Sequence, residues 1–308
     1  MASIRNITIR QLRALSETVR TGTLTAAAKM LGVTPPAITL QLQQLESQIG
    51  LPLLQRKAEG TVPTDAGKEL LALAERIENA LTDCDSALDA MKGLSGGKVC
   101  VGVVSTAKYF APFALSEFSK THPSIEMRLV IGNRQEVIDG LESFEIDVAI
   151  MGRPPAGMAV EQALIGDHPH VIIAPIGHPM IGRHCTLAEL SAETFLLREQ
   201  GSGTRLLTEF FFEQIGKTPR IGMEIGSNET IKQAVMAGLG IALISVHTIA
   251  AEIADRRLAI LDVEGLPVRR QWFLIRRKEK RLLPALSALH DFLASETGRF
   301  LPRIPGVT

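Results

Sequence analysis

The sequence predicts an α+β multidomain chain, with an N-terminal module of short helices, one long helix and a two-lobed α/β domain. Three observations support this prediction. Residues 1–64 show short helical repeats of apolar residues, residues 65–92 keep one apolar stripe, and strands alternate with helices from residue 98 onward. The length of 308 residues also suits about two domains.

Three short helices and a hairpin are expected in the first module. The helices span residues 9–21, 23–31 and 35–49, and the hairpin spans residues 51–64 with its turn at Glu59 and Gly60. Pro35 and Pro36 fall in the first turn of the third helix, where a helix tolerates proline. Two short helices joined by a tight turn are typical of the helix-turn-helix motif.

In that motif the first turns of the second of the two helices enter the major groove of DNA. Glutamine suits adenine there and threonine methyl groups suit thymine, while arginine on the hairpin meets the phosphate backbone. We therefore expect seven residues to contact DNA: Thr25, Thr34, Pro35, Pro36, Thr39, Gln43 and Arg56.

The net charge of zero excludes a polycation, but the charge is unevenly distributed. Residues 1–67 contain seven basic and four acidic residues, whereas residues 68–92 contain three basic and six acidic residues. The basic excess therefore lies in the module where a phosphate-binding surface is expected.

The long helix over 65–92 carries apolar residues at alternating spacings of four and three: Leu70, Ala74, Ile77, Leu81, Cys84 and Leu88. This spacing is typical of the seam of a coiled coil. It also fits an amphipathic helix that packs on its own domain. Because the helix has no second apolar stripe and glycines follow it, we expect a dimerisation helix followed by a hinge over residues 93–97.

Residues 98–308 predict open sheets with mostly parallel strands. About 210 residues are too many for one such sheet, so we expect lobe I over 98–167 and 266–308, and lobe II over 168–265. His168 and His170 flank Pro169, which predicts a surface turn and disfavours a metal site or a general base there.

Polar residues stand where predicted strands lead into helices. Their hydroxyl groups and the free amides of the helices suit an anion in a crevice between the lobes. The expected binding residues are Ser105, Thr106, Lys108, Asn133, Arg134, Arg153, Ser202, Gly203, Thr204, Ser227 and Asn228. The alternative is that these residues only cap helices.

Other classes of function find no support in the sequence. The three cysteines form no metal-binding pattern, and neither a phosphate-binding loop nor a nucleophile elbow is present, so we expect no enzyme, no catalytic residues, no metal and no cofactor. The N-terminus has no signal peptide and no apolar run reaches about 20 residues, so we expect a cytoplasmic protein without a membrane partner.

The segment from Leu12 to Leu71 resembles the winged helix-turn-helix of the LysR-type transcriptional regulators. The matching features are Ala26–Ala28, Pro36-Ala37, Leu45-Glu46, Gly50, Leu53-Leu54-x-Arg56 and Thr64-x-Ala66-Gly67. The resemblance covers essentially the whole chain. It implies a periplasmic-binding-protein-like effector domain, a dimer of dimers on promoter DNA, and RNA polymerase as a partner. Pro35, Thr39 and Leu40 depart from the usual family residues, which leaves the operator sequence open.

A narrower resemblance links five blocks of the chain to the regulators of the RuBisCO (Calvin-cycle) operon within that family. The blocks are VSTAKYFAP, IGNRQEVIDGL, DVAIMGRPP, REQGSGTR and MEIGSNETIKQAVMAGLGIALIS. It implies activation of carbon-fixation genes in response to a small phosphorylated or nucleotide metabolite. Two alternatives are a regulator of another operon with an organic-acid effector, and a solute-binding α/β protein with an oligomerisation module.

Overall fold

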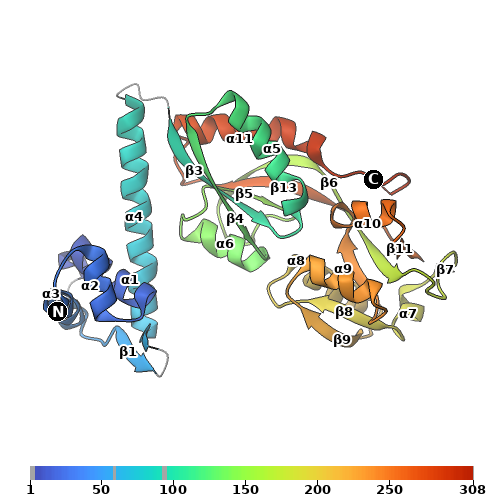
Figure 1. Cartoon of the computed structure of the whole chain (residues 1–308), viewed down its shortest axis with the longest axis horizontal. Helices are drawn as coiled ribbons and strands as arrows, with labels where there is room; N and C mark the ends of the chain where they lie inside the picture. Colours follow the sequence, from blue (N-terminus) through green and yellow to red (C-terminus); the bar gives the residue numbers. More distant parts are fainter. Residues whose placement is uncertain (1–3, 58–59, 92–95, 308) are drawn as a thin grey trace. The chain divides into compact units, whose positions relative to one another are not determined.

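The computed structural model describes residues 4–57, 60–91 and 96–307, and Figure 1 labels its elements. The chain divides into two compact units, residues 1–85 and 86–308, and each has its own core. Helix α4 (Asp65–Met91) belongs to the first unit up to residue 85. Of the hinge predicted over 93–97, residues 93–95 lie outside the described residues, and Gly97 already begins a strand.

The first unit contains the predicted short helices and hairpin. Its elements before α4 are η1 (Ile4–Asn6), α1 (Ile9–Thr21), α2 (Leu24–Leu31), α3 (Pro35–Ile49), β1 (Leu54–Lys57) and β2 (Gly60–Pro63). The Thr23 hydroxyl caps α2 by accepting the Ala26 amide at 3.2 Å. Helices α1, α2 and α3 each end at a glycine with φ between +65° and +77°, a left-handed conformation that glycine adopts without a steric penalty. Glu59 of the predicted turn lies outside the described residues.

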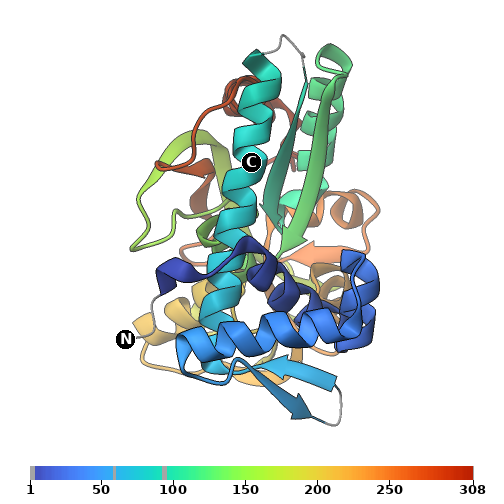
Figure 2. The same ribbon diagram turned by 90° about the vertical axis from the view of Figure 1, so that its left-hand side faces the viewer.

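The β1–β2 hairpin lies beside α3 (Figure 2), and Leu53 fixes its base. The Leu53 side chain is buried in the core of the unit, and the Glu46 carboxylate of α3 accepts the Leu53 amide at 2.8 Å. Gly67, in the first turn of α4, lies so close to the Leu53 carbonyl that a Cβ atom would stand 2.1 Å from that oxygen. These contacts hold the hairpin in a fixed position against α3 and α4.

The second unit begins with three parallel strands. β3 (Gly97–Val104) lies between β4 (Ile125–Gly132) and β5 (Val148–Met151). One face is covered by η2 (Ala107–Tyr109), α5 (Ala111–Thr121), α11 (Pro284–Glu296) and η4 (Thr297–Phe300), and the other by α6 (Arg134–Glu142). Figure 1 shows α5 and α11 on one side of the sheet and α6 on the other. This part of the unit is lobe I.

Two long strands connect lobe I with lobe II and run antiparallel to each other, β6 (Val160–Pro175) and β13 (Val268–Arg277). The expectation of mostly parallel strands is therefore wrong for this half of the sheet, because these strands carry the chain out of lobe I and back. The expected surface turn at His168–Pro169–His170 is also wrong: all three residues lie within β6, and both histidines are buried. Among the described residues Pro169 pairs only with Arg269 of β13, because the pairing with the strand Ala242–Ser245 covers residues 170–173, and a strand tolerates proline where one of its edges is open.

Lobe II is built on the far end of β6. β10 (Ala242–Ser245) and β11 (Leu258–Ile260) pair antiparallel with it, and β8 (Thr194–Arg198) pairs with β9 (Arg220–Ile225) in parallel. The remaining elements are β7 (His184–Cys185), α7 (Leu187–Leu190), α8 (Gly203–Gln214), α9 (Asn228–Met236), η3 (Val246–Thr248), α10 (Ala250–Ala254) and β12 (Asp262–Val263). Alternate residues of β6 face opposite cores, one under α9 and one under α8.

Candidate functional site

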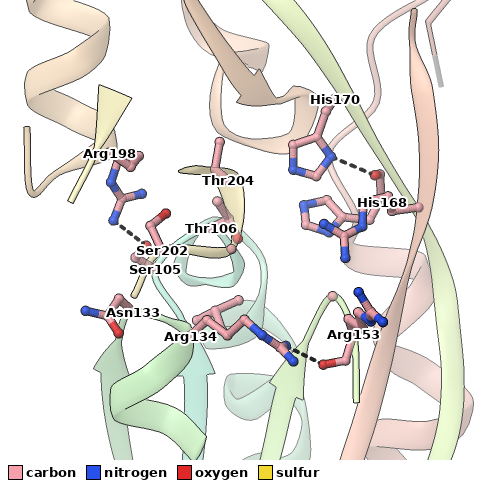
Figure 3. Close-up of a pocket in the computed structure, with 14 residues that line it drawn as sticks. Ser105, Thr106, Asn133, Arg134, Arg153, His168, His170, Arg198, Ser202 and Thr204 are labelled. Atoms are coloured by element: carbon pink, nitrogen blue, oxygen red, sulfur yellow. Dashed lines mark hydrogen bonds between the residues drawn. The ribbon is translucent and has the colours of Figure 1, made fainter. Parts of the chain in front are cut away.

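A cavity open to solvent lies between the two lobes of the second unit. The carboxyl ends of β3, β4 and β5 form one side, the residues that open α8 form a second, and β6 and β13 form the back wall (Figure 3). Open α/β sheets bind ligands at this end of their strands.

The structure brings eight of the eleven expected binding residues together in this cavity: Ser105, Thr106, Asn133, Arg134, Arg153, Ser202, Gly203 and Thr204. Lys108, Ser227 and Asn228 are not among its lining residues. Lys108 lies 3.9 Å from the Glu229 carboxylate, and the Asn228 side chain accepts a hydrogen bond from Arg198. Sequence reasoning missed six lining residues: Val104, Gly152, His168, His170, Arg198 and Arg270.

Three largely buried residues line the cavity with hydroxyl groups that have no protein partner among the described residues. The side chains of Thr106, Ser202 and Thr204 belong to residues that are 5%, 3% and 6% exposed. None of the three hydroxyls makes a hydrogen bond to the part of the chain that the structure describes, and neither Thr106 nor Ser202 caps the helix that follows it. A hydroxyl that lines a cavity and has no protein partner is free to hydrogen-bond a ligand there.

Two other expected residues have structural partners. The Asn133 side chain accepts the Glu136 amide at 3.0 Å and caps α6, as the capping alternative predicted. The Ser105 hydroxyl accepts a hydrogen bond from Arg198 at 3.2 Å, which joins lobe I to lobe II. A second bond between the lobes runs from the Gln135 amide to the Gly201 carbonyl at 3.3 Å.

Four arginines and no carboxylate line the cavity within the described ranges. Arg198 is held by Glu199 at 2.7 Å, and Arg134 donates to the Arg153 and Pro154 carbonyls. Within residues 4–57, 60–91 and 96–307, no carboxylate lies within 4 Å of the guanidinium groups of Arg134, Arg153 and Arg270. Burial lowers the pKa of Arg134 and of Arg270, and repulsion from neighbouring arginines lowers both further. The cavity therefore carries uncompensated positive charge that an anion would neutralise.

His168 and His170 line the back wall of the cavity, and the His247 ring stacks on His168 outside the lining. The Trp272 indole donates to His247 Nδ1 at 2.9 Å, and the His168 ring lies between Trp272 and the cavity, with its Nε2 atom 3.0 Å from the Ser245 hydroxyl. Burial lowers the pKa of His170 to about 3 and that of His247 to about 4, and it holds the pKa of His168 well below its usual value. All three rings are therefore neutral near pH 7.

The expected DNA-contact residues of the first unit are exposed or half-buried. Thr25, Thr34, Pro35, Pro36, Gln43 and Arg56 are exposed. Thr39 is half-buried, and its hydroxyl donates to the Pro35 carbonyl at 3.1 Å. Thr39, Gln43 and Arg56 line one groove between α3 and the hairpin. The arrangement presents an α-helix and a basic hairpin side by side.

The apolar stripe of α4 divides into two halves. Leu70 and Ala74 are buried within their own unit, and Ile77 is half-buried, so the first half fits the alternative of a helix packed on its own domain. Leu81 and Leu88 are 38% and 47% exposed, and Cys84 is exposed as well. Only the second half of the stripe is free to pair with another helix.

The described residues contain no group of three His, Cys, Asp or Glu side chains placed to hold a metal ion. Within the same ranges, no helix is both long enough and apolar enough to cross a bilayer.

Family models match both units. The model "Bacterial regulatory helix-turn-helix protein, lysR family" matches residues 9–68, and "LysR substrate binding domain" matches residues 92–298. The chain is 54% identical to the HTH-type transcriptional regulator CbbR of Xanthobacter flavus, over 97% of this chain and 91% of the relative. It is 42% identical to the RuBisCO operon transcriptional regulator of Allochromatium vinosum, over 97% and 99% of the two chains.

Two solved structures are similar. The CcmR regulatory domain of Synechocystis PCC6803, in complex with 2-PG, is 35% identical with a TM-score of 0.63, over 66% of this chain and 97% of that chain. Full-length CbnR in complex with its target DNA is 26% identical with a TM-score of 0.67, over 93% and 98% of the two chains.

Proposed function

The chain belongs to the LysR family of transcriptional regulators, and from this premise we propose that it activates a RuBisCO operon in response to a small anion bound between its lobes. We infer the target operon from a similar protein that is named as a RuBisCO operon transcriptional regulator. The proposed site of action is bacterial DNA, and hence the cytoplasm.

The cavity carries the proposal for the anion. Three hydroxyls without protein partners and three arginines without carboxylate partners within the described ranges face one space. An anion with phosphate or carboxylate oxygens would accept from both sets and relieve the repulsion among the arginines. The 2-PG complex of the similar CcmR domain supports a small phosphorylated effector.

The groove between α3 and the hairpin supports the proposal for DNA. An exposed glutamine on a helix and an exposed arginine on the adjoining hairpin match the base-reading and phosphate-binding roles of a winged helix-turn-helix. The exposed half of the α4 stripe supports pairing of two chains, and we extend this to a dimer of dimers that recruits RNA polymerase at the promoter.

The test is a footprint of the full-length protein on the promoter DNA upstream of the RuBisCO genes, with and without 2-phosphoglycolate. We expect protection of that DNA and a change of the protected region with effector. In Thr106→Val, which keeps the volume and removes a hydroxyl, the effector response should need about tenfold more ligand, while protection without ligand stays unchanged.

Protection that never changes with any phosphorylated metabolite would contradict the effector role. Equal affinity for promoter and random DNA would favour the alternative of a solute-binding protein, and strong protection of a different promoter would favour a regulator of another operon.

A further inference from the structure

His170 occupies a distinct place in the cavity. It lies on β6, is 2% exposed and lines the wall opposite Thr106 and Thr204. Figure 3 shows its hydrogen bond to the His168 carbonyl on one side of the ring, and the second ring nitrogen on the side of the two threonines.

The hydrogen bond fixes which ring nitrogen of His170 carries the proton. His170 Nδ1 lies 3.1 Å from the His168 carbonyl oxygen, and because a carbonyl oxygen only accepts, Nδ1 must donate. Burial lowers the pKa of this histidine to about 3, so the ring carries only that one proton near neutral pH. Nε2 therefore presents a lone pair, and it has no hydrogen-bond donor among the residues that the structure describes.

An acceptor at this point is unusual in a cavity built from donors. The arginines that line the cavity only donate, and the hydroxyls of Thr106, Ser202 and Thr204 can also donate. A phosphate or carboxylate oxygen would be repelled by the lone pair of His170 Nε2, so the charged groups of a ligand belong on the arginine and hydroxyl walls. An ammonium group would satisfy Nε2, but the positive charge of the arginines disfavours it.

We propose that His170 Nε2 accepts a hydrogen bond from a hydroxyl group of the effector, and that the cavity therefore binds small phosphates or carboxylates with a free hydroxyl more tightly than those without one, such as 2-phosphoglycolate. This inference rests on the proposed function of the cavity as an anion site. It adds a specificity-determining residue and narrows the chemical class of the ligand.

The test compares two compounds that differ only in the hydroxyl. These are 3-phosphoglycerate and 3-phosphooxypropanoate, which have the same length and the same charged groups. Titration calorimetry of the full-length protein should give about tenfold tighter binding of the hydroxylated compound, since the deoxy compound leaves a buried acceptor unpaired. The methyl ether of 3-phosphoglycerate keeps the oxygen without its proton and should bind no better than the deoxy compound.

Two variants test whether His170 causes the preference for the hydroxylated compound. His170→Phe should bind both compounds with the affinity that the parent has for the deoxy compound. The matched control is His247→Gln, a change in the same histidine group at a residue that does not line the cavity, and it should keep the tenfold preference. Circular dichroism establishes that each variant is folded, and the three compounds test the parent protein even where a variant is not.

The outcomes separate this inference from the proposed function. Binding of all three compounds with equal affinity would overturn the role of His170 and leave the anion site standing. A preference that persists in folded His170→Phe, or that His247→Gln also abolishes, would overturn it too. Absence of binding of every compound would instead overturn the anion site itself.

Discussion

The imidazole of His168 stacks on the indole of Trp272, with the ring centroids 3.7 Å apart and the planes 17° from parallel. Trp272 is the only tryptophan of the chain, and it is fully buried. His168 lines the cavity, so one ring separates the cavity from the single indole.

This stacking makes Trp272 a reporter of the cavity. Binding of 2-phosphoglycolate should change the emission of Trp272, because a ligand beside His168 alters the polarity next to the indole. The midpoint of a fluorescence titration should match the dissociation constant from calorimetry. Emission that stays constant while calorimetry shows saturation would place the anion away from His168.

Gly152 provides the space that His168 occupies. A Cβ atom at residue 152 would stand 2.8 Å from His168 Nδ1, so Gly152→Ala should displace the histidine ring and add a methyl group to the cavity wall. We expect at least tenfold weaker binding of 2-phosphoglycolate, with unchanged promoter binding in its absence. Gly226→Ala is the matched control, because a Cβ atom at residue 226 meets no atom within 4 Å. Equal affinities of the two variants would show that His168 moves elsewhere at no cost.

The buried histidines should make the stability of the second unit depend on pH. The pKa of His247 is about 4 in the folded protein, and a histidine in an unfolded chain has a pKa of about 6.5. Between these values the unfolded state binds more protons, so stability falls as the pH falls, by about 1.4 kcal/mol per pH unit for one such group. Above pH 6.5 this contribution is constant.

Urea melts at pH 6.5, 5.5 and 4.5 measure this effect. His247→Gln should lose less stability over that range than the parent, by about 1.4 kcal/mol for each pH unit. His290→Gln serves as the control, because that histidine is not part of the buried group. Parallel pH profiles of His247→Gln and the parent would contradict a neutral buried His247.

The two halves of the α4 stripe should respond differently to the same substitution. Leu81 is 38% exposed, so Leu81→Asp should leave each chain folded but separate the proposed dimer, since it would place two charges in the proposed apolar seam. Leu70→Asp instead buries a charge in the core of the first unit and should unfold it. Sedimentation and circular dichroism distinguish these results. A Leu81→Asp protein that sediments as an intact dimer would show that Leu81 does not lie in the dimer interface.

Substitutions of a base-reading residue and of a phosphate-binding residue should affect DNA binding differently. Gln43→Ala should weaken promoter binding by about 1–3 kcal/mol and random-DNA binding much less. Arg56→Ala should weaken both and reduce the slope of log affinity against log salt by about one. The measurement is a filter-binding series in increasing salt. If Gln43→Ala leaves the ratio of promoter affinity to random-DNA affinity unchanged, Gln43 does not read the bases.

The sequence predicted the strand ends of the cavity but not its back wall. Ser105 and Thr106 follow a strand with an almost continuous apolar run, and Asn133 follows a strand in which apolar residues alternate with Glu126 and Arg128; both patterns are recognisable in the sequence. His168 and Arg270 lie on the crossing strands, where histidines and a proline interrupt the apolar pattern and predict a turn. Their burial depends on pairing between residues about 100 positions apart, and local sequence carries no signal for that pairing.

The free polar groups of the cavity also differ in kind from those that hold the fold. Asn133 caps a helix and Arg198 links the lobes, so changing either would disturb the framework. Thr106, Ser202 and Thr204 have hydroxyls that bind nothing in the described chain. Mutations at these three positions can accumulate without unfolding the domain, so the same scaffold can evolve, or be engineered as a biosensor, to recognise a different metabolite while its DNA target stays the same.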